Sequence, residues 1–375
     1  MESIVKKAIK RAQSLDPAEK KAKLAELPND EELQQILESA QAKIKVVGVG
    51  GGGSNTVERM HEVGITGAET YAINTDAQDL INTVADKRLL IGRETTRGLG
   101  SGSEPQVGEA AARESIDELT EIIKGTDLLF ITCGLGGGTG TGASPVIAEI
   151  AKELGVLTVA VVTLPFTVEG RRRAENAMDG LAKLKEHADT IIVIPNDKIL
   201  EIAPDLPVNS AFKVADEVLT NAVKGIAEMV TKPGLINLDF ADLRTILKKG
   251  GAAMIGLGES RSEEASDARA LEAVENALNS PLLDVDISQS KRALVNVVGG
   301  ADMTLREAEM VVETVSLRID PNAHIIWGAM IDKELSKNRV QAMVVIAGGR
   351  FPYLEDFEKM HKEKGVIDLG IEFTG

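Results

Sequence analysis

The segment GLGGGTGTGAS at 134–144 limits the fold more than any other part of the chain. Five glycines and two threonines lie between Gly136 and Gly142. A strand-like run (LLFITC) precedes them and a helix-like run (SPVIAEIAKEL) follows, so the segment is not a linker between domains. Unpaired N–H groups and the dipole at a helix N-terminus favour anions, and glycines let the backbone curl around them. The segment therefore predicts a phosphate-binding loop, with hydroxyl donors from Thr139 and Thr141.

Strand-like segments recur through the first half of the chain. They read KIKVVGVG, AETYAINTD, TDLLFITCG, GVLTVAVVTLP and ADTIIVIPND, with many β-branched residues and few charges. Such runs are typical of strands buried on both faces of a parallel sheet. All but the second are followed by a segment of helical pattern. The alternation predicts an α/β fold with a doubly wound parallel sheet.

A long helix divides the chain. From 209 to 232 apolar residues repeat at three- and four-residue steps, and about 22 residues at 1.5 Å each span about 33 Å. Strand-like and helical segments alternate again after it and predict a smaller α/β C-terminal domain. The expected organisation is an N-terminal helical extension (1–42), a doubly wound domain (43–208), the central helix (209–232), the C-terminal domain (233–349) and a tail (350–375).

Composition argues against several classes of protein. Hydrophobic residues make up 43% and charged residues 27%, which is typical of a soluble globular protein. The single cysteine, Cys133, excludes an internal disulfide, and the histidines lack the spacing of a metal site. A net charge of -16 and 3% aromatic residues oppose nucleic-acid binding. No apolar run reaches the roughly 18 residues of a membrane span, so we expect a cytoplasmic protein without direct membrane insertion.

A second glycine loop leaves more than one interpretation open. Gly48, Gly50 and Gly53 form GxGxxG between a strand and a helix, and Asp76 ends the next strand. These positions would suit an NAD-dependent oxidoreductase, in which such an acid binds the ribose. Glycines that only allow close packing explain them equally well. Neither alternative uses the loop at 136–142, and the chain contains no GxxxxGK[ST] of a Walker loop.

The run GGGTGTG at 136–142 resembles the GGGTG[ST]G signature of the tubulin/FtsZ family, and the resemblance covers about residues 43–350. It implies a GTPase that polymerises head to tail into filaments of the cytokinetic ring at the division site. It makes 43–208 the GTP-binding domain and 233–349 the GTPase-activating domain. GTP or GDP and Mg2+ are the implied ligands, and Mg2+ is expected on phosphate oxygens and water with no protein ligand assigned. The longer N-terminal extension and the tail resemble archaeal members.

The same resemblance implies the nucleotide contacts. Glu169 in PFTVEGRRR would hold the ribose, Arg173 would lie near the phosphates, and IPND supplies Asn196. Phe212 would stack on the base, although a core position is the alternative. Asp216 lies four residues on, on the same helical face, and would accept from guanine N1 and N2, a donor pair that adenine lacks. The residues implied around the phosphates are Gly50, Gly51, Gly52, Asn55, Asn74, Thr75, Asp76, Gly100, Gly102, Gly136, Gly137, Gly138, Thr139 and Gly140.

The segment INLDFADLRTIL at 236–247 carries Asp239 and Asp242 just after the long helix. Two such acids could simply cap the next helix. Because the base-binding positions lie at the start of a helix of about 33 Å, one chain is not expected to bring both regions to one nucleotide. Head-to-tail stacking would do so between subunits, and a heterologous contact that does not close produces a filament. The match to the family's NxDxxD loop at Asn237, Asp239 and Asp242 implies that the acids polarise the attacking water.

The two ends of the chain carry separate expectations. The tail closes with GVIDLGIEFTG, and we expect residues 366–375 to bind a membrane-tethering protein, with an unstructured end as the alternative. The N-terminal extension is expected to be packed or frayed, and a membrane-surface helix is the second choice. A filament that binds GTP structurally and hydrolyses it poorly also remains open.

Overall fold

The computed structural model describes residues 42–202, 205, 207–232, 234–248, 250–260, 267–283, 286–332, 335 and 338–348. The expected tail at 350–375, and the expected N-terminal extension apart from Ala42, lie outside these residues. All of the described residues belong to one compact unit. Among the described helices, none has both the length and the apolar character needed to cross a bilayer.

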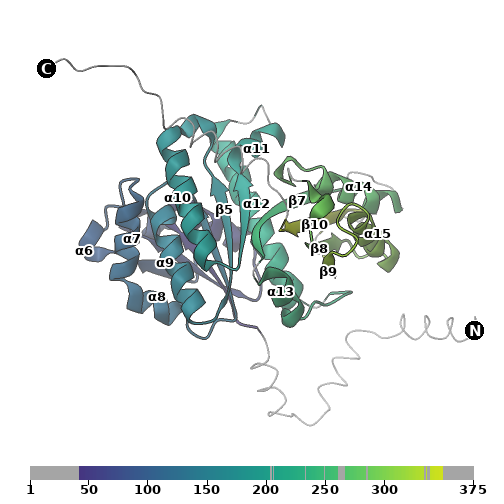
Figure 1. The fold of residues 1–375 in the computed structure, drawn as a ribbon, viewed down its shortest axis with the longest axis horizontal. Helices are drawn as coiled ribbons and strands as arrows, with labels where there is room; N and C mark the ends of the chain where they lie inside the picture. Colours follow the sequence, from purple (N-terminus) through teal and green to yellow (C-terminus); the bar gives the residue numbers. More distant parts are fainter. Residues whose placement is uncertain are drawn as a thin grey trace, which may run out of the picture. The chain divides into compact units, whose positions relative to one another are not determined.

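The first half of the described chain forms a parallel sheet in the order β3-β2-β1-β4-β5-β6. Figure 1 labels one of these strands, β5. Its strands are β1 Ile44–Val49, β2 Ala68–Asn74, β3 Lys87–Leu90, β4 Leu128–Gly134, β5 Leu157–Leu164 and β6 Thr190–Pro195. Apolar residues keep both faces of the central strands β5 and β6 buried throughout. The sequence pattern did not predict β3, because exposed Lys87 and Arg88 begin it.

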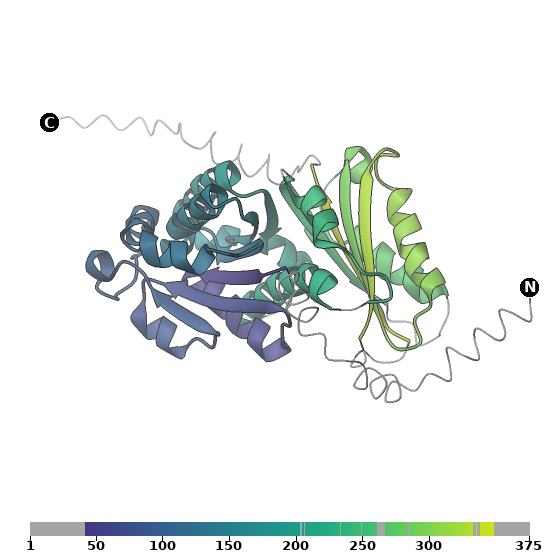
Figure 2. The same cartoon turned by 90° about the horizontal axis from the view of Figure 1, so that it is seen from below.

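Helices cover both faces of this sheet (Figure 2), as the doubly wound prediction requires. Apolar residues of α7 to α10 form one core cluster with the sheet, and those of α4, α12 and α13 form the other. The bounds are α4 Gly50–Val63, α5 Ala77–Asn82, α6 Arg93–Thr96, α7 Pro105–Glu114, α8 Ile116–Ile123, α9 Thr139–Glu153, η1 Thr167–Glu169, α10 Arg171–His187, α11 Asn196–Ile202 and α12 Val208–Thr231. At 24 residues, α12 is about 36 Å long.

The C-terminal half extends the same sheet in the order β7-β10-β8-β9. Thr190 to Ile192 of β6 pair in parallel with Gly251 to Ala253 of β7, and β10 runs antiparallel to both β7 and β8. The bounds are α13 Phe240–Leu247, β7 Gly251–Glu259, α14 Asp267–Leu278, η2 Pro281–Leu283, η3 Ile287–Gln289, β8 Arg292–Gly299, α15 Leu305–Ser316, β9 His324–Ile331 and β10 Val340–Ala347. The smaller α/β domain after the long helix is therefore present.

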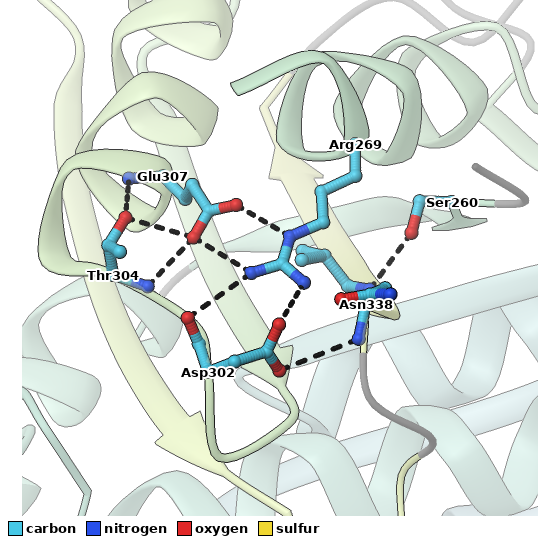
Figure 3. A network of polar contacts seen from close by, with 7 residues as sticks. Ser260, Arg269, Asp302, Thr304, Glu307 and Asn338 are labelled. Carbon is cyan, nitrogen blue, oxygen red and sulfur yellow. Dashed lines mark hydrogen bonds and ion pairs between the residues drawn. The ribbon is translucent and has the colours of Figure 1, made fainter. Parts of the chain in front are cut away.

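A buried ion network holds α14 and α15 of this domain together (Figure 3). Arg269 is 1% exposed, and its guanidinium donates to Glu307 at 2.6 and 3.0 Å and to the Asp302 carboxylate at 2.6 Å. The hydrogen bonds to Glu307 hold the pKa of Arg269 above its ordinary value. Glu307 also forms a capping box with Thr304 at the start of α15. Removing one partner would leave a buried charge unpaired, which costs about 3–5 kcal/mol.

Candidate functional site

The carboxyl ends of the parallel strands meet at one edge of the sheet, where open α/β sheets bind ligands. β1 ends at Val49, β4 at Gly134 and β6 at Pro195, and α4 and α11 begin at the next residues, Gly50 and Asn196. Apart from Asn74, the last residue of β2, and Phe212 and Asp216 of α12, the predicted nucleotide-contacting residues lie in segments that follow the parallel strands β1 to β6. The topology thus collects positions that are far apart in the sequence at a single edge.

Two long helices begin side by side at this edge. A Cβ built on Gly50 at the start of α4 would lie 2.9 Å from the amide nitrogen of Gly140 in the first turn of α9. Neither helix has a side-chain N-cap or an acidic residue in its first turn. Gly51, Gly52 and Asn55 of α4 are exposed here. Two sets of unpaired N–H groups therefore face the same space, which is an arrangement that attracts phosphate.

Not every glycine of the 134–144 segment serves a ligand. A Cβ on Gly142 would overlap the carbonyl oxygen of Pro105, because α7 packs directly against α9. The hydroxyl of Thr141 accepts a hydrogen bond from the Gly136 N–H at 2.9 Å and is 1% exposed. The hydroxyl of Thr141 therefore helps to stabilise the loop by accepting this bond, and its expected role as a donor to phosphate stays a prediction.

A chain of three hydroxyls joins the phosphate loops. The hydroxyl of Thr139 lies 2.7 Å from that of Thr75 and 3.0 Å from that of Ser101, and all three residues are buried. The N–H of Gly100 donates to the Thr75 carbonyl at 3.1 Å, so the 98–104 loop rests on this group. Ser101 was not predicted, although it lies between the predicted Gly100 and Gly102. It belongs to the site through its hydroxyl, which a glycine pattern does not reveal.

Two carboxylates lie beside the phosphate loops. Asp76 caps α5 by accepting from the N–H groups of Gln78 and Asp79 at 2.9 and 3.2 Å. Asn74 donates its amide to Asp79 at 2.6 Å, and the Asp79 carboxylate lies 3.7 Å from a Cβ built on Gly51. Burial, and then the charge of Asp76, raise the pKa of Asp79. Asp79 was not predicted, because nothing in the sequence separates it from an ordinary helix-surface acid.

The predicted base-binding residues lie together near the start of α12. Phe212 is 40% exposed and packs edge-on against Phe166, with ring centroids 5.1 Å apart, so it is not a core residue. Asp216 accepts from the Thr56 hydroxyl at 3.5 Å, and burial raises the pKa of its carboxyl to about 7. Phe166 and Thr56 were not predicted, since they come from segments 46 and 160 residues away in the chain.

The predicted ribose-side residues form a compact turn. Glu169 accepts from the Phe166 N–H at 2.8 Å with one carboxylate oxygen and pairs with Arg173 through the other. Gly137 lies near this pair, because a Cβ there would be 3.9 Å from the Arg173 guanidinium. Asn196 is 5% exposed, and its side-chain oxygen has no hydrogen-bond partner among the described residues. A buried acceptor left unpaired at this edge requires a donor from a ligand or water.

The predicted acids lie elsewhere, beyond the other end of α12. Asn237, Asp239 and Asp242 are all exposed, and the Asn237 side chain accepts from the Gly234 N–H at 2.6 Å. Asp239 is the N-cap residue of α13 and Asp242 lies in its first turn, so their positions match the capping alternative, but the Asp239 side chain makes no cap hydrogen bond. No side chain among the described residues contacts either carboxylate by a hydrogen bond or ion pair. The chain does not bring these acids to its own phosphate loops.

Known families match both halves of the chain. The description "Tubulin/FtsZ family, GTPase domain" applies to residues 43–204, and "FtsZ family, C-terminal domain" applies to residues 251–350. The chain belongs to the tubulin/FtsZ family. It is therefore a GTPase that binds GTP and GDP. The NAD-dependent oxidoreductase alternative finds no support.

Individual relatives agree with the family. "Cell division protein FtsZ 1" of Methanocaldococcus jannaschii is 59% identical over 321 residues, 86% of this chain and 87% of that protein. The protein of the same name from Pyrococcus furiosus is 57% identical over 345 residues, 92% and 91% of the two chains. A solved "FtsZ dimer, empty" from M. jannaschii is 59% identical with a TM-score of 0.81, covering 86% of this chain and 92% of that one. CetZ2 from Haloferax volcanii, at 22% identity and a TM-score of 0.74 over 86% and 98% of the chains, shares the fold.

Proposed function

We propose that this tubulin/FtsZ-family GTPase polymerises head to tail, so that the acids of one subunit complete the catalytic site on the GTP of the next. The observation that carries the proposal is the separation of the two halves. Asp239 and Asp242 are exposed beyond the end of a helix of about 36 Å whose other end carries Phe212 and Asp216. The M. jannaschii FtsZ that resembles this chain is described as a dimer, which supports self-association.

The proposed nucleotide contacts follow the chemistry of the sheet edge. The N-termini of α4 and α9 would bind the phosphates through backbone N–H groups. The hydroxyl of Thr139 lies between those of Thr75 and Ser101. Through these bonds Thr139 would hold the loop at 98–104, which is proposed to meet the γ-phosphate, beside the N-termini of the two helices. Phe212 offers an exposed ring to the base, and the Asp216 carboxylate would accept from guanine N1 and N2. Glu169, Arg173 and Asn196 would surround the ribose and the adjoining phosphates.

The donor set beside the phosphates fits Mg2+. The carboxylates of Asp76 and Asp79 would lie near the ion, whereas the Asn74 amide oxygen already accepts from the N–H groups of Thr75 and Asp76. Among the described residues, no group of three His, Cys, Asp or Glu side chains could hold a metal ion by itself. Mg2+ prefers one or two carboxylates together with phosphate oxygens and water. When bound, it would neutralise charge that develops on the phosphates. The two carboxylates would then help to orient it beside the glycine loops.

Hydrolysis would use residues of the neighbouring subunit. Asp239 and Asp242 would orient the attacking water, and one of them would accept its proton as the water oxygen bonds to the γ-phosphorus. The bond from the γ-phosphorus to the β–γ bridging oxygen would break, so that GDP leaves and inorganic phosphate forms. Asn237 shapes the loop that presents them, through its hydrogen bond to the Gly234 N–H. Loss of the γ-phosphate would remove a contact between subunits and so favour their separation.

Exposed apolar side chains support contacts at both proposed faces. Leu99 and Val168, in the loops around the phosphate edge, are 83% and 89% exposed. Leu235, just before the acid loop, is 48% exposed. Burying such side chains between subunits contributes about 1.5–3 kcal/mol each when complete.

In the cell, the filaments would form the cytokinetic ring at the division site in the cytoplasm, in keeping with relatives named cell division proteins. The tail at 366–375 would bind a membrane-tethering protein. Light scattering and sedimentation test the polymer: GTP with Mg2+ should give sedimenting filaments and GDP should not. Failure to assemble over a wide range of protein concentration would contradict the proposal.

A further inference from the structure

The helix that presents the acids is short and needs support from outside. α13 has eight residues, fewer than the roughly 12–15 that make an isolated helix even marginally stable. Leu243, Ile246 and Leu247 are buried and anchor one face. The catalytic geometry therefore depends on whatever fixes the direction of this helix.

Two side chains hold the last turn of α13. The guanidinium of Arg292 donates to the carbonyls of Ile246 and Lys248 at 3.3 and 2.9 Å. The hydroxyl of Thr190 donates to the carbonyl of Leu247, which lies between them. The final carbonyls of a helix lack partners within the helix, and a cation there also complements the helix dipole. Three consecutive carbonyls are thus satisfied by donors from outside the helix.

The two donors come from different domains. Thr190 is the first residue of β6 in the GTPase domain, and Arg292 is the first residue of β8 in the C-terminal domain. Gly250 makes room for the hydrogen bond from Thr190 to the Leu247 carbonyl, because a Cβ on Gly250 would overlap the Thr190 hydroxyl. α13 packs against β5 of one domain and against β8 and β9 of the other. Its direction is therefore set by both domains together.

We propose that Thr190 and Arg292 are positioning residues for GTP hydrolysis, which clamp α13 so that Asp239 and Asp242 meet the neighbouring subunit's nucleotide correctly. The inference rests on the proposed shared site. Neither residue contacts nucleotide, and each acts through the direction of α13. A shift of about 1 Å in catalytic groups can lower a rate about 100-fold, so a loosened helix end is enough to slow turnover.

The test compares variants of the full chain. Arg292→Ala and Thr190→Val should lower kcat in assembled protein about 10-fold or more, with GTP affinity and the assembly threshold within about twofold of wild type. Arg292→Lys and Thr190→Ser keep a donor and should recover part of the rate. Lys291→Ala is the matched control and should leave kcat unchanged, because Lys291 is exposed and its side chain makes no hydrogen bond or ion pair with a described residue.

Mixing separates positioning from general destabilisation. Arg292→Ala subunits should regain turnover when mixed with Asp216→Ala subunits, which carry intact acids but a damaged base site. Arg292→Ala subunits should regain no turnover when mixed with subunits that carry both Asp239→Ala and Asp242→Ala. In that mixture neither kind of subunit presents working acids to its neighbour's nucleotide. The proposal would be overturned if the loss of kcat were proportional to the loss of protein able to bind GTP. Thr190 and Arg292 would then only stabilise the fold. If separated monomers hydrolysed GTP at the full rate of assembled protein, the proposed site shared between subunits would be contradicted, independently of the results with the Arg292 variants.

Discussion

The two ends of α12 differ in how many of the polar side chains around them find hydrogen-bond or ion-pair partners within the same chain. At the nucleotide end, the Thr139 hydroxyl bonds to those of Thr75 and Ser101, and Glu169 is fixed by a backbone N–H and by Arg173. At the acid end, Asp239 and Asp242 have no side-chain partner among the described residues. The first region is preorganised for a small ligand. The second presents charges that acquire a role only against another surface.

The largest effect should come from the acid end. Replacing Asp239 and Asp242 together with alanine should lower kcat about 1000-fold, because proton transfer and water orientation are both lost. GTP affinity should stay within about twofold, since neither residue belongs to the nucleotide end. Phosphate release and equilibrium binding measure the two quantities. Glu309→Gln, an exposed acid on α15, is the control, and a loss of GTP binding in the double variant would break the distinction between the ends.

The next effect concerns guanine recognition at the nucleotide end. Asp216→Asn replaces one of the acceptor oxygens with an N–H donor that opposes guanine N2. Selectivity for GTP over ATP should fall about 100-fold, the equivalent of about 3 kcal/mol for a lost charged hydrogen-bond pair. Competition binding with the two nucleotides measures it. Unchanged selectivity would mean that another residue reads the base.

The same carboxylate predicts a pH dependence. Burial raises the pKa of Asp216 to about 7 in the free protein, while guanine requires the ionised form. GTP affinity is therefore full above this pKa and falls as the pH drops through it, by about 10-fold between pH 8 and pH 6. Titration calorimetry across this range measures both the affinity and the proton released. Asp216→Asn should lose the dependence, and a flat profile in wild type would show that Asp216 is already ionised.

The smallest effect tests the hydroxyl chain. Ser101→Ala removes one hydroxyl contact worth about 1 kcal/mol, so GTP affinity should fall about fivefold. GDP affinity should hardly change, because the 98–104 loop is proposed to meet only the γ-phosphate. Ser103→Ala in the same loop is the control, since the Ser103 side chain is exposed. Equal losses for GTP and GDP would assign Ser101 to loop stability alone.

Sequence patterns predicted the fold where burial is repetitive. The strands β4, β5 and β6 are largely apolar runs, and the long α12 has a clear helical repeat. The pattern failed at β3, which begins with exposed Lys87 and Arg88 at the edge of the sheet. It gave no sign of α5, which has only six residues and one buried side chain, Leu80. Short elements at the edge of a sheet bury too few side chains to produce a hydrophobic repeat in the sequence.

The candidate site shows the same limit. Glycine loops and the Phe212–Asp216 spacing are local, so the sequence could predict them, and their roles in binding stay predictions. Phe166 and Thr56 join the base site only through the topology of the sheet. The hydrogen bond that the Thr141 hydroxyl accepts from the Gly136 N–H likewise depends on how the loop folds and could not be predicted from the glycine pattern. The family resemblance supplied the roles of Glu169, Arg173 and Asn196, which no spacing alone would have singled out.

The central claim is that one subunit holds GTP and the next supplies the acids. Phosphate release per subunit, measured against protein concentration with saturating GTP and Mg2+, tests it most directly. A shared site predicts negligible specific activity below the assembly threshold and a linear rise in rate above it. Full specific activity at concentrations far below that threshold would contradict the account, because separated chains would then complete the reaction alone.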